Sequence, residues 1–146
     1  EWYTPQYIFD YLNRIYNFDL DPCATPLSAK CDKYFTKEEN GLTQDWNNHN
    51  VFCNPPYNRG IKDWIEKGSK IVGGICVMLI PARTDTKYWH EHIFGKASEI
   101  IFIKGRLKFY RNIEGKLVQG ESSTFPSAII VFGKGNDTKY SFLDIK

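Results

Sequence analysis

The sequence contains no apolar run that could cross a membrane and no cysteine spacing typical of a zinc site. A membrane-spanning helix needs about 18 consecutive apolar residues, and the longest candidate, residues 71–82, is interrupted by Gly73 and Gly74. The four cysteines form no Cys-x-x-Cys pair, and the triplet His90-Glu91-His92 lacks a third placed ligand. We therefore expect neither a membrane partner nor a bound metal.

The chain also lacks a large net charge, low-complexity segments and a signal-peptide pattern. Its 146 residues carry a formal charge of +2, so any surface for nucleic acid has to be local. The composition, 42% hydrophobic and 25% charged, is that of a folded domain. The length fits one domain, residues 1–146, without a separate target-recognition domain. The absence of a signal peptide predicts a cytoplasmic location with reduced cysteines.

Aromatic residues are the one class in clear excess. Ten Phe, nine Tyr and four Trp make up 16% of the chain. Large rings let a small core bury enough apolar area, and rings near the surface can stack on a planar ligand. Both interpretations stay open from composition alone.

The hydrophobic pattern predicts helices that alternate with strands. Helices are expected after Thr4-Pro5, with Thr4 as N-cap and apolar residues at positions 8, 12 and 15, and at residues 61–72 and 86–94. Strands are expected at residues 17–20, 33–36, 50–53, 74–80, 99–103, 127–132 and 140–145, with a hairpin over 105–124. This alternation indicates an α/β fold with a mostly parallel sheet, in which ligands bind beyond the carboxyl ends of the strands.

Two of the expected strands end in unusual turns. Asp21-Pro22-Cys23-Ala24 follows the strand at 17–20, and Asn54-Pro55-Pro56-Tyr57 follows the strand at 50–53. A third, polar turn contains Asp45-Trp46. We expect the three turns to converge on one crevice at the edge of the sheet.

The turn Asn54-Pro55-Pro56-Tyr57 suits chemistry on an exocyclic amine such as N6 of adenine. The lone pair of such an amine is delocalised into the ring, so the nitrogen is a poor nucleophile. Two acceptors, the Asn54 side-chain oxygen and the Pro55 carbonyl, can take its two N–H groups and direct the lone pair at a methyl donor. The prolines hold that carbonyl rigid, and the ring of Tyr57 can stack on the base. The same four residues are also typical of a tight turn, but the position directly after an apolar strand favours the catalytic interpretation.

The sequence resembles the phage-type DNA N6-adenine methyltransferase family over almost its whole length. The resemblance rests on motifs in a fixed order: Glu1-Trp2-Tyr3-Thr4-Pro5, residues 18–24, Asp45-Trp46, residues 51–57, residues 79–86, residues 105–109 and Pro126-Ser127-Ala128. It implies a Rossmann-like class I methyltransferase sheet, mostly parallel with a C-terminal antiparallel hairpin, in a minimal single domain. It also implies S-adenosylmethionine as methyl donor, adenine in DNA as acceptor, and a phage or prophage origin.

The resemblance places the methyl donor against the turns already singled out. An acidic group such as Asp21 can accept from the α-ammonium of the donor, the small Ala24 lets the backbone come close, and Asp45 can accept from the donor's adenine amine. The full set of expected cofactor-binding residues is Trp2, Thr4, Pro5, Asp19, Asp21, Pro22, Cys23, Ala24, Asp45 and Trp46. For the ribose hydroxyls, Glu38 and Glu39 are the nearest acidic candidates.

DNA contacts are expected from basic residues interleaved with aromatic ones after two of the strands. The expected DNA-binding residues are Arg83, Lys87, Trp89, Arg106 and Lys108. A base inside a duplex has to be extruded before it can react. Base specificity then has to come from the loop at 83–92 and the hairpin at 105–124, with a second subunit in a homo-oligomer as a further candidate.

Three other functions stay open at this point. The same tetrapeptide could act on N4 of cytosine or on the planar amide of a protein glutamine, since both pose the same lone-pair problem. A non-catalytic nucleic-acid-binding module is the alternative from another class. A role in restriction-modification is a further hypothesis that the residues do not test.

Overall fold

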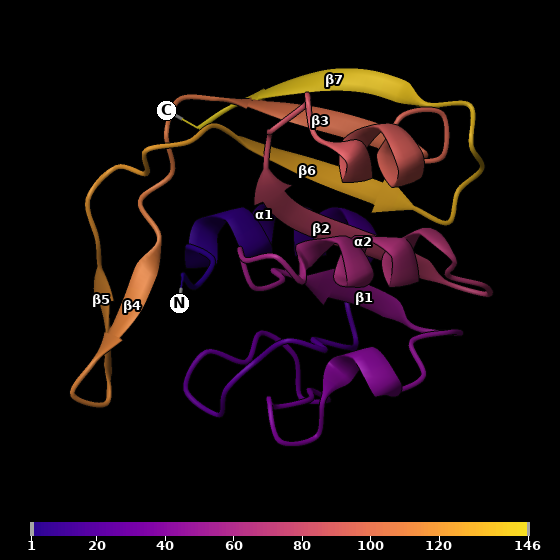
Figure 1. The fold of residues 1–146 in the computed structure, drawn as a ribbon. Coiled ribbons are helices and arrows are strands. Elements are labelled where there is room, and N and C mark those ends of the chain that lie inside the picture. The colour runs from indigo at the N-terminus through magenta and orange to yellow at the C-terminus, as the bar shows by residue number, and fades with distance from the viewer. Residues whose placement is uncertain (1, 146) are drawn as a thin grey trace.

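The computed structural model describes residues 2–145 and is built around a five-stranded sheet with the order β1-β2-β6-β3-β7 (Figure 1). The strands are β1 (Asn50–Cys53), β2 (Ile75–Pro81), β3 (Glu99–Lys104), β6 (Ser127–Phe132) and β7 (Lys139–Asp144). β1 pairs with β2 and β3 with β7 in parallel, whereas β6 is antiparallel to both of its neighbours. The expectation of a mostly parallel sheet is confirmed, and β6 is the exception.

The reversed direction of β6 follows from the hairpin that precedes it. The chain leaves the sheet at the carboxyl end of β3, runs through β4 (Tyr110–Ile113) and β5 (Lys116–Gln119), and returns at the same edge (Figure 1). The next strand therefore has to run back across the sheet. The turn falls within the expected hairpin, at Glu114 and Gly115, whose φ angles of 50° and 82° are those that a two-residue hairpin loop requires.

Helices cover both faces of the sheet, which explains why β2 and β6 are buried at every position. α1 (Gln6–Tyr16) lies on one face, and α2 (Ile61–Ser69) and the short π-helix η2 (Trp89–Ile93) lie on the other (Figure 1). Alternate residues of β2 divide between two clusters: Val77 and Leu79 pack with α1, while Met78 and Ile80 pack with α2. This is the pattern of a strand buried on both sides.

The first helix is confirmed in place, but its start and its inner face differ from expectation. Pro5 is the N-cap, with φ −58°, and no side chain caps the helix. The prediction of Thr4 as N-cap is therefore wrong; its side chain is buried instead. Ile8 and Leu12 are buried as expected, whereas Ile15 is 55% exposed.

The segment between α1 and β1 is less regular than predicted. The expected strands at 17–20 and 33–36 are reduced to two isolated bridges, Leu20 with Val51 and Asp21 with Tyr34. Asp21 binds backbone N–H groups of its own segment through its side chain, which competes with a regular ladder. A 3₁₀ turn, η1 (Gly41–Thr43), begins directly after Asn40, whose side chain accepts from the N–H of Leu42.

Within residues 2–145, none of the helices has both the length and the apolar character that crossing a bilayer requires. Glu1, the first residue of the N-terminal motif, lies outside the described residues.

Candidate active site

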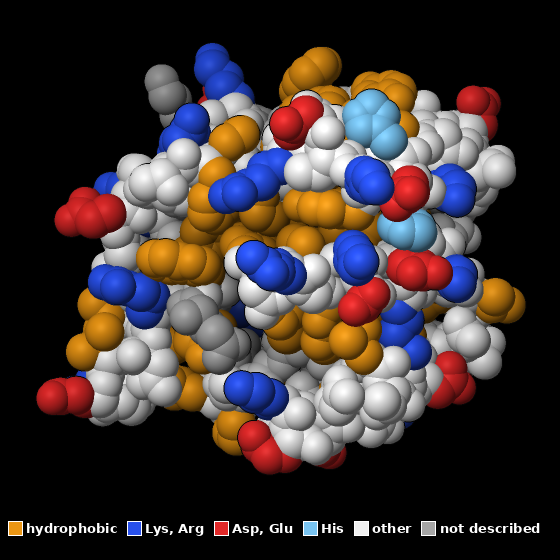
Figure 2. Space-filling view, viewed as in Figure 1, with side chains coloured by type: hydrophobic (Ala, Val, Ile, Leu, Met, Phe, Trp, Pro, Cys, Tyr) orange, Lys and Arg blue, Asp and Glu red, His pale blue; other side chains and the backbone are white. Residues whose placement is uncertain are grey.

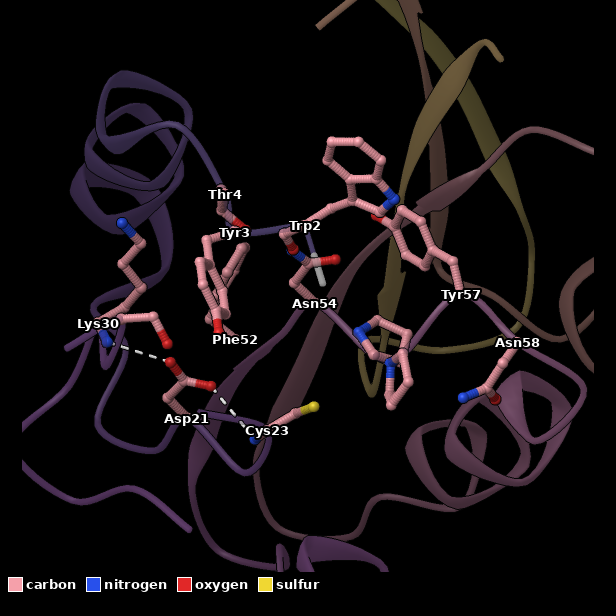
Figure 3. Close-up of a pocket in the computed structure, with 13 residues that line it drawn as sticks. Trp2, Tyr3, Thr4, Asp21, Cys23, Lys30, Phe52, Asn54, Tyr57 and Asn58 are labelled. Atoms are coloured by element: carbon pink, nitrogen blue, oxygen red, sulfur yellow. Dashed lines mark hydrogen bonds between the residues drawn. The ribbon is translucent and has the colours of Figure 1, made fainter. Parts of the chain in front are cut away.

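A cavity opens where the end of β1 meets the N-terminal residues and the turn after Leu20 (Figure 3). Its volume is about 220 Å³, and we call it the Asn54 cavity. Its wall is formed by Trp2, Tyr3, Thr4, Asp21, Cys23, Ser28, Lys30, Phe52, Asn54, Pro55, Pro56, Tyr57 and Asn58. The structure therefore brings two of the three predicted turns, those at Asp21 and Asn54, to one site.

Asn54 carries the most distinctive polar group of this cavity. Its Nδ2 donates a 2.8 Å hydrogen bond to the main-chain oxygen of Trp2. Its Oδ1 is buried and has no hydrogen-bond partner among residues 2–145. A buried acceptor without a donor costs about 1–3 kcal/mol, so this oxygen is well suited to accept from a ligand.

Tyr57 is fixed by its hydroxyl and by two aromatic neighbours. The hydroxyl donates to the main-chain oxygen of Leu79 at 2.8 Å, and the rings of Phe109 and Phe125 pack edge-to-face at 6.0 and 5.6 Å. Burial raises the pKa of Tyr57 well above its usual value. The phenol therefore stays neutral, and its hydrogen bond to the Leu79 oxygen anchors the ring.

Asp21 is the buried acid of the site. Its carboxylate accepts from the main-chain N–H of Lys30 at 3.0 Å and of Cys23 at 3.3 Å (Figure 3). Burial raises the pKa of Asp21 to about 7, although these two N–H groups act to lower it. The charge of Lys30 also acts to lower this pKa, but less than burial raises it, so an ionised carboxylate in this position suits a cationic ligand.

A second cavity of about 280 Å³ continues from the first, and we call it the Gly41 cavity. The two cavities share Tyr3, Cys23, Pro56 and Asn58. The other residues around it are Pro22, Ala24, Thr25, Thr36, Lys37, Asn40, Gly41 and Trp64. A Cβ atom added at Gly41 would overlap with the carbonyl oxygen of Pro22, so a glycine is needed for the backbone to approach this closely.

Comparison with known proteins matches this chain to one family. The family model described as "DNA N-6-adenine-methyltransferase (Dam)" covers residues 1–145. The chain belongs to this family.

Two phage proteins with the name DNA N-6-adenine-methyltransferase are among its relatives. The protein of Haemophilus phage HP1 is 31% identical over 136 residues, which cover 90% of this chain and 77% of the relative. The protein of Escherichia phage T1 is 32% identical over 141 residues, which cover 83% of this chain and 58% of the relative. The resemblance to the phage-type family is thus confirmed, and the chain spans just over half the length of the T1 protein.

Several residues that were expected to bind the cofactor lie outside both cavities of this family member. Asp19 accepts from Nδ1 of His49 and from the N–H of Asn50, and so ties the segment before Asp21 to β1. Asp45 is exposed, and its carboxylate accepts from the N–H of Asn47 in a local turn. The remaining residues outside the two cavity walls are Pro5, Trp46, Glu38 and Glu39.

Trp46 supports the Gly41 cavity from behind. It is 2% exposed, its Nε1 donates to the main-chain oxygen of Gly41 at 2.8 Å, and its ring lies 5.9 Å from that of Trp64. Trp64 itself lines the cavity. The indole of Trp46 therefore shapes the wall without reaching the cavity.

Of the expected DNA-binding residues, four are exposed and one is not. Arg83, Lys87, Arg106 and Lys108 are exposed; the Arg83 guanidinium lies 5.7 Å from the ring of Phe125. Trp89 is fully buried, and its Nε1 donates to the main-chain oxygen of Pro81. The expectation that Trp89 contacts DNA is not supported, because its apolar ring fills the core beneath η2.

Some lining residues escaped the sequence analysis. The residues of the Asn54 cavity that it did not name as site residues are Tyr3, Ser28, Lys30, Phe52 and Asn58. Tyr3, Phe52 and Asn58 lie within two residues of named site residues in the sequence, so widening each motif by two residues would have included them. Ser28 and Lys30 come from an irregular loop without a recognisable pattern. In the described part of the chain, no group of three or more His, Cys, Asp or Glu is placed to hold a metal ion.

Proposed function

We propose that this chain transfers a methyl group from S-adenosylmethionine to the N6 amine of adenine in DNA. The buried Oδ1 of Asn54, which has no partner within residues 2–145, is the observation that carries the proposal. Membership of the DNA N-6-adenine-methyltransferase family supports it. The sheet, with Leu20 bridged in parallel to Val51 at its β1 edge, is consistent with a Rossmann-like methyltransferase fold.

The residues of the two cavities fit the methyl donor. Asp21 is a buried acceptor that suits the α-ammonium group, and Thr4 lies in the same wall. Ala24 and Trp64 of the Gly41 cavity offer apolar surface for the adenosine part. When bound, S-adenosylmethionine supplies an electrophilic methyl group.

Asn54 and Pro55 prepare the acceptor amine. Oδ1 of Asn54 accepts one N–H of the adenine amine, and the Pro55 carbonyl accepts the other. The two bonds pull the nitrogen from planar towards tetrahedral geometry, so its lone pair becomes available as a nucleophile. An Asn side chain cannot act as a base at neutral pH, so the proton leaves after methyl transfer, when the nitrogen is acidic.

Four exposed basic residues suit the phosphates of DNA. Arg83 and Lys87 follow β2, and Arg106 and Lys108 begin the hairpin. Figure 2 shows Lys and Arg side chains spread among apolar ones over the face of the molecule that Figure 1 presents. Lys and Arg at a DNA interface neutralise phosphates and fix the register of the duplex.

The direct test is to incubate the protein with methyl-labelled S-adenosylmethionine and DNA that carries no adenine methylation. We expect label in the DNA, recovered as N6-methyladenine after nucleoside digestion and mass spectrometry. Sequencing of the modified DNA would then give the target site.

The matched control is Asn54→Ala, which should bind the donor but transfer almost no label. Label on N4 of cytosine, or on a protein glutamine only, would replace the proposal with one of the alternatives. If the donor gave no thermal stabilisation at high concentration, a non-catalytic nucleic-acid-binding module would be the better interpretation.

A further inference from the structure

The N-terminal segment of the described chain, residues 2–4, crosses the corner that carries Asn54; we call it the strap. The main-chain oxygen of Trp2 accepts the 2.8 Å hydrogen bond from Nδ2 of Asn54 (Figure 3). The exposed indole of Trp2 borders the Asn54 cavity on one side and a cavity of about 240 Å³ beside the hairpin on the other. The strap therefore lies between Asn54 and the hairpin.

The strap is held by the hairpin through main-chain hydrogen bonds. Tyr3 and Tyr110 exchange two of them: the N–H of Tyr3 donates to the Tyr110 oxygen at 2.8 Å, and the N–H of Tyr110 donates back at 2.9 Å. The Arg111 guanidinium lies 5.6 Å from the Trp2 ring, and the Phe109 ring lies 6.4 Å from it. The strap thus continues the hairpin as a short third strand beside β4.

The N–H of Tyr110 serves the strap alone and not the hairpin ladder. Phe109 and Gly120 form a hydrogen-bonded rung, in which the Gly120 N–H donates to the Phe109 oxygen at 2.8 Å. Hydrogen-bonded and non-bonded pairs alternate along an antiparallel ladder, so the next pair, Tyr110 with Gln119, is a non-bonded one. The N–H of Tyr110 accordingly faces the strap, and that of Gln119 faces away from β4.

The strap contact decides which end of the Asn54 amide faces the cavity. The oxygen and the NH₂ group of an amide have nearly the same size, so packing alone hardly distinguishes the two orientations. With the amide reversed, Oδ1 would face the Trp2 oxygen, and two acceptors would repel each other. The Trp2 carbonyl therefore accepts the NH₂ end and leaves Oδ1 for a ligand.

We infer that Trp2 and Tyr110 are positioning residues, which act through main-chain groups to hold the Asn54 amide with Oδ1 directed at the substrate amine. The role of Oδ1 in this inference rests on the proposed function. The hairpin is then part of the catalytic framework as well as a surface for DNA, because Tyr110 anchors Tyr3, the residue next to the Trp2 carbonyl that orients Asn54.

The test removes the Tyr110 N–H with proline. Tyr110→Pro is compared with Tyr110→Ala, which loses the same phenol but keeps the N–H, and with Gln119→Pro on the same rung. We expect Tyr110→Pro to lower kcat for DNA methylation about 10- to 100-fold relative to Tyr110→Ala, as small displacements of catalytic groups do. Donor affinity and KM for DNA should stay within about twofold, and Gln119→Pro should retain the wild-type kcat.

A double-mutant cycle with Asn54→Ala shows whether the effect passes through Asn54. Residues that act through one another are non-additive, so Tyr110→Pro should lower the single-turnover rate no further when the amide is already absent. An equal loss of rate in both backgrounds, or an equal loss in Gln119→Pro, would show a general distortion of the hairpin and overturn the inference. So would a wild-type kcat in Tyr110→Pro.

Nuclear magnetic resonance gives a readout that does not depend on activity. The side-chain NH₂ signal of Asn54, assigned by its absence from Asn54→Ala, should be protected from solvent exchange in the wild type and unprotected in Tyr110→Pro. Exchange in the wild type as fast as for an exposed amide would overturn the positioning role. A protected amide in a protein that methylates no adenine would instead leave the positioning intact and contradict the proposed function.

Discussion

The two sides of the Asn54 cavity are built in different ways. The Asn54 side, here called the strand side, extends a regular strand: β1 lies beside the fully buried strand β2, and Cys53, the residue before Asn54, is completely buried. The Asp21 side, here called the loop side, belongs to the irregular segment 20–49, which has only isolated bridges and one 3₁₀ turn. Here the chain is fixed by single side-chain contacts, such as those of Asp21 with the N–H groups of Lys30 and Cys23.

This difference matches what each side would have to do. A group that polarises a reacting amine needs a fixed position, and the end of a buried strand followed by two prolines provides it. A site for a flexible donor molecule needs several separate contacts around a larger volume, which a loop provides. Substitutions on the strand side should therefore lower the rate of methylation, and substitutions on the loop side should weaken donor binding.

The largest effect is expected on the strand side, from Asn54→Ala. Loss of Oδ1 should lower kcat about 10²- to 10³-fold, the usual consequence of losing one preorganised polar group. Thermal-shift titration should show that the affinity for S-adenosylmethionine is kept, because Asn54 faces the amine. Loss of donor binding in this variant would mean that the two sides are not separate.

The next largest effect is expected on the loop side, from Gly41→Ala. The new Cβ would overlap with the Pro22 carbonyl oxygen, and the backbone shift should lower the free energy of unfolding by about 1–3 kcal/mol and weaken donor binding. Denaturant unfolding and calorimetric titration measure the two quantities. The matched control is Gly60→Ala, whose nearest contact would be Oδ1 of Asn58 at 3.3 Å. If Gly41→Ala changed neither the free energy of unfolding nor donor affinity, the loop side would be more adaptable than its packing suggests.

The same contrast explains what could be predicted from the sequence. The strand side was predictable because β1 and β2 are short apolar runs bounded by proline and glycine, and the Asn-Pro-Pro-Tyr motif follows directly. The loop side was predictable only at the turn of residues 21–24, which lines the two cavities, because its other contacts depend on distant main-chain groups. Lys30 reaches the cavity nine residues after Asp21 through its N–H, which leaves no trace in residue type.

Two of the predicted residues lie away from the cavity walls, each for a reason of local packing or hydrogen bonding. Asp45 and Trp89 were assigned by residue type and by their position after a motif, but side-chain type does not determine which way a side chain points. Asp45 caps a local turn, and Trp89 packs into the core as its large apolar surface favours. The direction of β6 also depended on where the hairpin returns, which no local pattern specifies.

A third prediction uses the buried acid of the loop side. Because the pKa of Asp21 is about 7, its ionised fraction, and with it the affinity for a cationic donor, should fall about eightfold from pH 7.5 to pH 6. Asp21→Asn should bind more weakly at pH 7.5 and lose this pH dependence, as measured by calorimetric titration. A pH dependence that persists in Asp21→Asn would assign the titration to another group.

The stability of the ligand-free protein should change with pH in the opposite sense. A folded-state pKa raised from 3.8 to about 7 means that the folded chain holds this proton more tightly than the unfolded chain. The contribution of Asp21 is therefore fully present below pH 4 and is lost as the pH rises to 7. Asp21→Asn should remove this part of the pH dependence of unfolding, and an unchanged profile would contradict the burial argument.

The smallest effect is expected from Tyr57→Phe, which separates two uses of one residue on the strand side. The hydroxyl is bound to the Leu79 oxygen, so its loss should lower the free energy of unfolding by about 1 kcal/mol. The ring keeps its packing on Phe109 and Phe125 and can still stack on a base. Thermal unfolding and single-turnover methylation measure the two consequences, with the exposed Tyr11→Phe as control. Because the hydroxyl is an anchor, the methylation rate should change less than twofold; a rate loss of tenfold or more would show that it takes part in the reaction.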